Sequence, residues 1–318
     1  MWVLQQPGPG VFDTLEVDTP TAADVQEAEL LVRFSAGAIC GSDIPKFHGH
    51  IDPQNPYTGL PGVPLHELVG YVEASKSERF VPGDRVVGIV AKSRGLQEYR
   101  VNPADLMFKV DDRLSDIHAT MVQPLASVFG ALDRVPNYEG RTVAAIGLGP
   151  LGILFTHLLK SRGAKKVIGV DRVDRSDVAK EFGVDELVVG DSSTWAASLS
   201  GGDDRPVLVV DAVGHQQEIL VDAVTALERH GHLLVFGLPE EHYAFPIRTF
   251  FRKDLSLNAG VTHEWVRFLD EAQEYVLNCN GLPDSYITHV LSVTEAESAF
   301  NLYSRPAIGR LKVALTAP

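Results

Sequence analysis

The chain is poor in cysteine and lacks long apolar runs. It has two cysteines in 318 residues, which is too few for a disulfide framework and typical of a reducing, cytoplasmic compartment. The longest apolar stretch, residues 143–155, is interrupted by three glycines and a proline. It is also shorter than the about 18 residues that a membrane-spanning helix needs. The N-terminal MWVLQQPGPG has neither the basic nor the apolar region of a signal peptide, so we expect a cytoplasmic protein without membrane contacts.

Positive charge is scarce as well. Lysine and arginine number 28 against 42 aspartates and glutamates, and the resulting net charge of −14 is spread along the chain. Nucleic acids and anionic membranes select basic surfaces, so neither is an expected partner. Apolar residues make up 45% and charged residues 22% of the sequence, which is the composition of an ordinary globular protein.

The length and the residue pattern predict two domains. A chain of 318 residues exceeds the about 100 to 200 residues that one domain usually has. Before about residue 140, short apolar runs at 30–34, 68–74 and 85–90 are separated by Gly, Pro and Asp. This pattern indicates antiparallel strands in a barrel or sandwich.

After about residue 140, predicted strands alternate with predicted helices. The strands are expected at 142–146, 166–171, 207–214, 232–237 and 255–261. After the first of them, one helical face is formed by Leu151, Leu154, Phe155, Leu158 and Leu159. Such alternation predicts a parallel, doubly wound α/β sheet. From about residue 263 a helical run and short strands follow, and we expect this segment to rejoin the first domain.

A glycine loop follows the first strand of this α/β region. In GLGPLG at 147–152, Gly147 allows a tight turn, Gly149 lets a pyrophosphate approach the backbone, and Gly152 lets helix and strand pack closely. Leu148, Pro150 and Leu151 complete the loop and begin the helix, whose free N–H groups face the phosphates. The alternative interpretation is a glycine-rich turn without a ligand, but the flanking strand and helix favour a dinucleotide.

Asp171 bears on the choice of dinucleotide. It ends the next strand 19 residues after Gly152, where an acid that binds the ribose is expected. A carboxylate accepts hydrogen bonds from a free 2′-hydroxyl and repels a 2′-phosphate, which favours NAD over NADP. Arg172 follows directly and could pair with a phosphate, stack on the adenine or remain a surface charge. Gly214 and Gly237 end two later strands and are further candidates for cofactor contacts.

Five motifs together resemble a known family. They are CGSD at 40–43, PxHExxG at 64–70, PGDRV at 82–86, QPLA at 123–126 and GLGPLG at 147–152. In this order they resemble the zinc-dependent medium-chain dehydrogenase/reductase superfamily, which includes alcohol, sorbitol, threonine and glucose dehydrogenases. The resemblance implies a GroES-like β-barrel catalytic domain over 1–124, a Rossmann domain over 125–262 and a return to the catalytic domain over 263–318. It also implies a homodimer or homotetramer formed through the Rossmann domains.

The resemblance implies one catalytic zinc ion. Cys40 and His66 match zinc ligands, and Glu67 matches a glutamate that binds the metal or lies behind it. Gln123 lies where polyol dehydrogenases have a glutamate that binds the metal or its water. A thiolate with neutral His66 and Gln123 would leave the site at +1, so we expect Glu67 to bind the metal when no substrate is present. Ser42 matches the hydroxyl that relays the alcohol proton.

The sequence departs from the family pattern at several points. Leu65 replaces the usual glycine before His66, and Pro45 stands where many alcohol dehydrogenases have a relay histidine. His48 could replace that histidine, although we expect His48 and His50 to be surface residues and Asp43 to cap the turn after Cys40. The four-cysteine structural zinc lobe is missing, so any zinc is catalytic, and Cys279 is an incidental thiol. Substrate specificity is expected in the loop 48–60, which includes Tyr57.

Three functional interpretations remain open at this point. The favoured one is a zinc- and NAD(P)-dependent dehydrogenase that interconverts a secondary alcohol, such as a polyol, sugar or cyclitol, and its carbonyl. The second is a zinc-free quinone or enone reductase of the same superfamily. The third is a catalytically silent dinucleotide-binding protein. The simultaneous presence of Cys40, His66 and Glu67 argues against the second.

Overall fold

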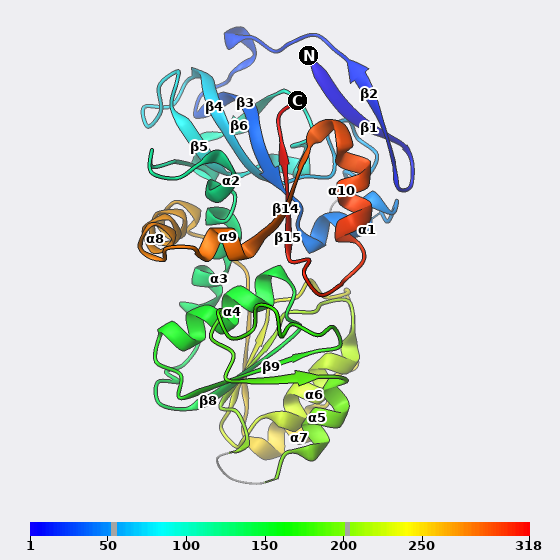
Figure 1. Cartoon of the computed structure of the whole chain (residues 1–318), viewed down its shortest axis with the longest axis vertical. Coiled ribbons are helices and arrows are strands. Elements are labelled where there is room, and N and C mark those ends of the chain that lie inside the picture. Colours follow the sequence, from blue (N-terminus) through cyan, green and yellow to red (C-terminus); the bar gives the residue numbers. More distant parts are fainter. Residues whose placement is uncertain (52–55, 201–203) are drawn as a thin grey trace. The chain divides into compact units, whose positions relative to one another are not determined.

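The computed structural model describes residues 1–51, 56–200 and 204–318 and has two compact units (Figure 1). Unit 1 consists of Met1–Ala126, Glu264–Arg305 and Arg310–Pro318. Unit 2 consists of Ser127–His263 and Pro306–Gly309. The chain therefore leaves the first unit, builds the second, and returns. None of the described helices is long and apolar enough to cross a membrane.

Unit 1 is built on a seven-stranded sheet with the order β14-β15-β3-β4-β5-β7, and β6 pairs with β3. The predicted antiparallel strands are confirmed, since β3 pairs antiparallel with β4 and β4 with β5. The strands are β3 (Glu29–Ala38), β4 (Glu67–Ser75), β5 (Arg85–Ile89), β6 (Tyr99–Pro103), β7 (Met107–Lys109), β14 (Ile287–Ser292) and β15 (Lys312–Thr316). A separate hairpin is formed by β1 (Trp2–Gly8) and β2 (Val11–Glu16).

Short helices surround this sheet, and the C-terminal strand lies within it. The helices are α1 (Ile44–Phe47), α2 (Asp116–Ala119), α8 (Trp265–Asn278), α9 (Leu282–Tyr286) and α10 (Ala296–Tyr303). Phe47 of α1 and Phe300 of α10 are fully buried and stack with their ring centroids 5.0 Å apart. The strand β15 lies between β14 and β3. Residues near the C-terminus therefore lie in the interior of unit 1, which consists mainly of the N-terminal part of the chain.

Unit 2 is a six-stranded sheet with the order β10-β9-β8-β11-β12-β13, and all of its pairs are parallel. The strands are β8 (Thr142–Ile146), β9 (Lys166–Asp171), β10 (Glu186–Val189), β11 (Leu208–Asp211), β12 (His232–Val235) and β13 (Ser256–Ala259). The helices are α4 (Pro150–Ser161), α5 (Ser192–Ser198), α6 (Gln217–Ala226) and α7 (Ile247–Lys253). The predicted doubly wound α/β sheet is thus confirmed. Its order reverses between β8 and β11, and ligands bind such sheets beside the carboxyl ends of the strands at this point.

The hydrophobic core of unit 2 explains why its strands are almost continuously apolar. Val143, Ala144 and Ala145 of β8 are fully buried, because helices cover both faces of a parallel sheet. Leu154 and Phe155 of α4 are fully buried as well. The strand, the turn and the helix therefore form one rigid support for the glycine loop between them.

Candidate metal centre and dinucleotide-binding loop

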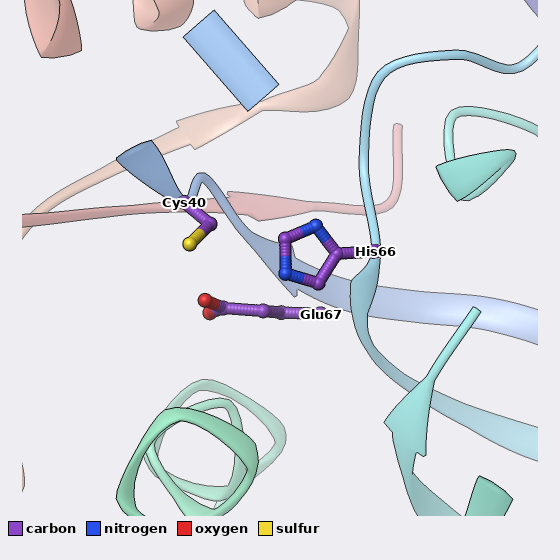
Figure 2. Close-up of side chains that lie close together, drawn as sticks. All are labelled: Cys40, His66 and Glu67. Atoms are coloured by element: carbon purple, nitrogen blue, oxygen red, sulfur yellow. The ribbon is translucent and has the colours of Figure 1, made fainter. Parts of the chain in front are cut away.

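Three potential metal ligands converge in unit 1. Ala38, at the end of β3, is paired with Glu67 at the start of β4. This antiparallel register brings Cys40, just beyond β3, beside His66 and Glu67. One ligand atom of each residue, the Cys40 Sγ, a His66 ring nitrogen and a Glu67 carboxylate oxygen, lies within 4.8 Å of the other two. Figure 2 shows these side chains pointing toward one another. Sheet pairing therefore assembles the cluster from two separate motifs.

Asp43 orients the histidine of this cluster. It is fully buried, its Oδ2 accepts a hydrogen bond from the Cys40 N–H at 3.0 Å, and its Oδ1 lies 2.9 Å from His66 Nδ1. Nε2 is therefore the nitrogen left to bind a metal, as in the carboxylate–histidine–zinc arrangement. Burial alone would lower the pKa of His66, but Asp43 and then Cys40 outweigh it and raise the pKa well above its usual value. Burial works against ionisation of Asp43 too, yet His66 lowers its pKa.

Lys312 pairs with the glutamate. Both side chains are 1% exposed, and Nζ lies 2.7 Å from each carboxylate oxygen. Burial raises the pKa of Glu67, although Lys312 and His66 oppose the shift. Nζ donates to Oε1, whereas Oε2 is a buried oxygen that accepts no hydrogen bond in the described part of the chain. The ammonium therefore contacts both oxygens of Glu67, and its hydrogen bond goes to Oε1.

The donor set fits a zinc ion. A thiolate, an imidazole and a carboxylate are all zinc ligands, and catalytic zinc sites have three protein ligands with a fourth position open. Oε2 of Glu67 has acceptor capacity beyond its ion pair with Lys312, because it receives no hydrogen bond within the described residues. The geometry thus allows Cys40, His66 and Glu67 to hold zinc. That Glu67 binds the metal when no substrate is present stays a prediction.

The remaining residues predicted for this site are placed as follows. Gln123 is buried in the first turn of α3 (Val122–Leu132), and its role as a metal ligand stays a prediction. Ser42 is half-buried in the short turn Gly41–Asp43, and its role as a proton relay stays a prediction as well. His48 and His50 are exposed, as expected. Within the loop 48–60, residues 52–55 lie outside the described residues, and the Tyr57 ring lies 5.9 Å from Lys92 Nζ.

Leu65 is accommodated by glycines on neighbouring segments. Its side chain is fully buried. A Cβ atom on Gly37 would lie 2.7 Å from Leu65 Cδ2, and one on Gly95 would lie 2.7 Å from the Leu65 carbonyl oxygen. A larger residue at Gly95 would force the backbone apart, and one at Gly37 would require the Leu65 side chain to move. The Leu65 side chain therefore fits before His66 because Gly37 and Gly95, which face Leu65, have no side chains.

The glycine loop of unit 2 makes a tight turn from β8 into α4. Gly147 has a positive φ of 89°, and a Cβ atom on Gly152 would lie 1.7 Å from the Gly147 carbonyl oxygen. Gly149 caps the N-terminus of α4, and a Cβ atom there would meet nothing within 4 Å. Gly147 and Gly152 are thus required by the turn itself. Gly149 instead faces open space at a helix N-terminus, where an anion binds favourably.

Asp171 holds the glycine loop in place. Its Oδ2 accepts from the Leu148 N–H at 2.6 Å and its Oδ1 from the Val173 N–H at 2.8 Å. Each carboxylate oxygen keeps a further lone pair for a ribose hydroxyl. The Arg172 guanidinium donates to the Gln216 side chain at 3.2 Å. The carboxylate therefore fits a ribose diol, and the contact with cofactor remains a prediction.

Gly214 and Gly237 have a packing reason to be glycine. A Cβ atom on Gly237 would lie 2.1 Å from the Gly214 nitrogen, and one on Gly214 would lie 2.6 Å from the Leu238 nitrogen. The backbones after β11 and β12 thus touch at the carboxyl edge of the sheet. This packing explains both glycines without a cofactor, and their contacts with the cofactor stay predictions.

Sequence reasoning missed two residues of the metal centre and underrated a third. Lys312 is separated from Glu67 by 245 positions, and only the placement of β15 beside β3 brings them together. Lys46 is buried next to Ser42, which no local pattern indicates. Asp43 was expected only to cap the turn, which it does, but it also contacts His66. The position of Asp43, three residues after Cys40, was the feature of the sequence that could have indicated this contact.

Comparisons with known families agree with both units. Residues 26–112 match the alcohol dehydrogenase GroES-like domain, and residues 150–279 match the zinc-binding dehydrogenase family. The first match covers β3 to β7 with Cys40, His66 and Glu67. The second begins within the glycine loop. The expected GroES-like and Rossmann folds are confirmed.

Several individual proteins are similar to the chain over nearly its full length. The starvation-sensing protein RspB of Escherichia coli is 25% identical over 99% of this chain and 98% of its own. D-arabinitol dehydrogenase 1 of Uromyces fabae is 23% identical over 95% of this chain and 93% of its own. Among solved structures, the alcohol dehydrogenase TADH of Thermus sp. ATN1 has a TM-score of 0.86 and 25% identity, and each chain covers all of the other.

Proposed function

The chain belongs to the zinc-dependent medium-chain dehydrogenase/reductase superfamily of oxidoreductases, and from this premise we propose that it is a zinc- and NAD-dependent dehydrogenase of a secondary alcohol. The substrate would be a polyol, a sugar or a cyclitol-like alcohol, which is interconverted with its carbonyl. The observation that carries the proposal is the convergence of Cys40, His66 and Glu67 within 4.8 Å.

The roles of the chain's own residues follow from their contacts. Cys40, His66 and Glu67 would hold zinc, and Asp43 fixes the imidazole so that Nε2 is presented. A bound zinc ion supplies Lewis acidity that lowers the pKa of an alcohol, and a bound nicotinamide accepts hydride. The Oγ of Ser42 takes the alcohol proton and passes it to water, since Pro45 cannot relay it. Lys312 neutralises Glu67 when that carboxylate is not on the metal.

NAD is the proposed dinucleotide. Asp171 presents a carboxylate at the end of β9 beside the glycine loop, and a 2′-phosphate would be repelled there. Gly149 leaves the N-terminus of α4 open to the pyrophosphate. Fluorescence titration with NADH and NADPH tests this choice. Tighter binding of NADPH would contradict it.

Metal content and activity together test the whole proposal. We expect about one zinc per chain, and NAD reduction with members of a panel of polyols and sugar alcohols. The matched control is the double variant Cys40→Ser/His66→Gln, which should lose the metal and the activity but retain NADH binding. If the protein purified from zinc-supplemented cells contained no zinc and reduced enones, the zinc-free reductase would be favoured instead.

A sensing role is the second candidate. The similarity to a protein named for starvation sensing supports it, together with the replacement of the relay histidine by Pro45. A sensor would bind NADH and zinc but turn over none of the alcohols. Single-turnover measurement of NADH formation with the polyol panel separates the two candidates.

We also propose that the protein is a homodimer or homotetramer formed through unit 2. The strand β13 lies at the edge of the sheet and pairs with β12 on one side. Leu257 on it is 42% exposed and Val261 just after it is 55% exposed. An open edge strand with exposed apolar residues is suited to pairing with another chain.

A further inference from the structure

Lys46 is a buried lysine beside the proposed proton relay. It lies in α1, and only 8% of the residue is exposed. Its Nζ donates to the Ser42 carbonyl oxygen at 3.2 Å. An ammonium group has three N–H donors, and this is the one hydrogen bond that the Lys46 ammonium makes within the described residues. At least one further N–H of the ammonium has no acceptor among the described residues.

The acids around Lys46 are already engaged. Asp43 uses Oδ1 for His66 and Oδ2 for the Cys40 N–H, and Glu67 is paired with Lys312. Lys46 has no carboxylate within 4.0 Å across residues 1–51, 56–200 and 204–318, and it acts on Asp43 only through space. Burying an ammonium without a close counter-ion is unfavourable. A counter-ion supplied by a ligand would relieve this cost.

We propose that Lys46 is a specificity-determining residue that binds an anionic group, a carboxylate or a phosphate monoester, on the substrate alcohol. The inference rests on the proposed function, which places the reacting hydroxyl at Ser42. Because Lys46 folds back over the turn that carries Ser42, the anionic group lies a few atoms from the reacting carbon. The preferred substrate is then a hydroxy acid or a phosphorylated polyol rather than a neutral polyol.

Neutral hydroxyl groups satisfy this site less well. They could accept the remaining hydrogen bonds of Lys46, but they bring no charge to compensate the ammonium. A carboxylate or phosphate adds the attraction of opposite charges to the hydrogen bond from the ammonium, and this attraction is stronger where water is excluded. The charge of the substrate, more than its number of hydroxyl groups, should therefore determine its KM.

The test compares three alcohols on one carbon skeleton: the neutral polyol, the corresponding aldonate and the polyol phosphate. The full-length zinc-loaded protein is assayed as wild type, Lys46→Met, Lys46→Arg and, as a control, the exposed Lys180→Met. For at least one anion, wild type should have a KM about 10- to 100-fold below that of the neutral polyol. Lys46→Met should abolish the difference, whereas Lys46→Arg and Lys180→Met should keep most of it.

A binding measurement without turnover supports the kinetics. Calorimetric titration of metal-free protein with the same aldonate and polyol phosphate should detect one site that Lys46→Met loses. The stronger of the two ligands identifies the carboxylate or the phosphate. A neutral polyol preferred equally by wild type and Lys46→Met would overturn the inference and leave the proposed function intact. Absence of turnover with every alcohol would instead contradict the proposed function.

Discussion

The Oδ1 atom of Asp43 lies 2.9 Å from Nδ1 of His66, and the other oxygen of the same carboxylate accepts the Cys40 N–H at 3.0 Å. One fully buried acid thus fixes two of the three proposed metal ligands. It sets the tautomer and the ring orientation of the imidazole, and it sets the backbone from which the thiol extends. The metal centre is therefore preorganised by a residue that is not one of the proposed ligands.

Replacing Asp43 by Asn should weaken zinc binding. The amide can still accept the Cys40 N–H, but it brings no charge to His66. Loss of such an outer partner typically lowers metal affinity about 10- to 100-fold. Competition with a chromogenic chelator measures the change. Asp105→Asn, at an exposed acid of the same unit, is the control, and equal affinity of Asp43→Asn and wild type would contradict the role.

Much of unit 2 was predictable because its sequence signals are local. The alternation of strands and helices after residue 140, the glycine loop and the acid 19 residues after Gly152 predict a unit with a parallel sheet. Hydrophobic periodicity and turn residues depend on neighbours in the sequence, which is why they could be recognised without the structure. The Cys40, His66 and Glu67 set came from resemblance rather than spacing. Lys312 could not be found, because it reaches Glu67 only through the pairing of β15 with β3.

Two glycine substitutions should separate folding from cofactor binding. In Gly152→Ala the new Cβ atom would lie 1.7 Å from the Gly147 carbonyl oxygen, so the loop must move and the protein should lose stability. In Gly149→Ala the new methyl group meets open space, so stability should change by less than about 1 kcal/mol. NADH binding should nevertheless weaken, because the methyl group occupies the path of the pyrophosphate. Urea denaturation and NADH titration of both variants check this, and unchanged NADH affinity in Gly149→Ala would argue against a pyrophosphate there.

Asp211 should make unit 2 less stable as the pH rises. Burial raises its pKa, against the opposing backbone N–H groups of Val213 and Gly214. The folded state therefore binds more protons than the unfolded state between the usual value of 3.8 and the raised one. In that window stability falls with increasing pH. Asp211→Asn should remove this component, so in this window the urea midpoint of the variant should rise more, or fall less, with increasing pH than that of wild type. A midpoint that rises less with pH in the variant than in wild type would show that the sign is wrong.

Leu257→Lys should disrupt the proposed oligomer. The strand β13 has one unpaired edge in the described chain, and a lysine on an edge strand opposes pairing between copies. Light scattering after size exclusion should report a dimer or tetramer for wild type and a monomer for the variant. Val221→Lys, at a 43% exposed position on α6, should keep the wild-type mass. A monomeric wild type would refute assembly through this edge.

Lys312→Met should be one of the most damaging single substitutions in unit 1. It leaves Glu67 buried without its cation, and removing one partner of a buried ion pair typically costs about 3–5 kcal/mol. The metal-free protein should therefore lose this much stability in urea denaturation, and the double variant Glu67→Gln/Lys312→Met should recover most of it. Lys166→Met breaks an ion pair whose partners are 42% and 45% exposed. It should cost no more than about 1 kcal/mol.

The stabilisation of the same variants by zinc shows whether Glu67 binds the metal or lies behind it. If Glu67 binds the metal, zinc supplies the positive charge that Lys312→Met removed. Saturating zinc should therefore stabilise Lys312→Met more than it stabilises wild type, and the excess should vanish in the double variant, which has no carboxylate to respond. Equal stabilisation of wild type and Lys312→Met would mean that Glu67 stays behind the metal, because only direct ligation lets one cation replace the other.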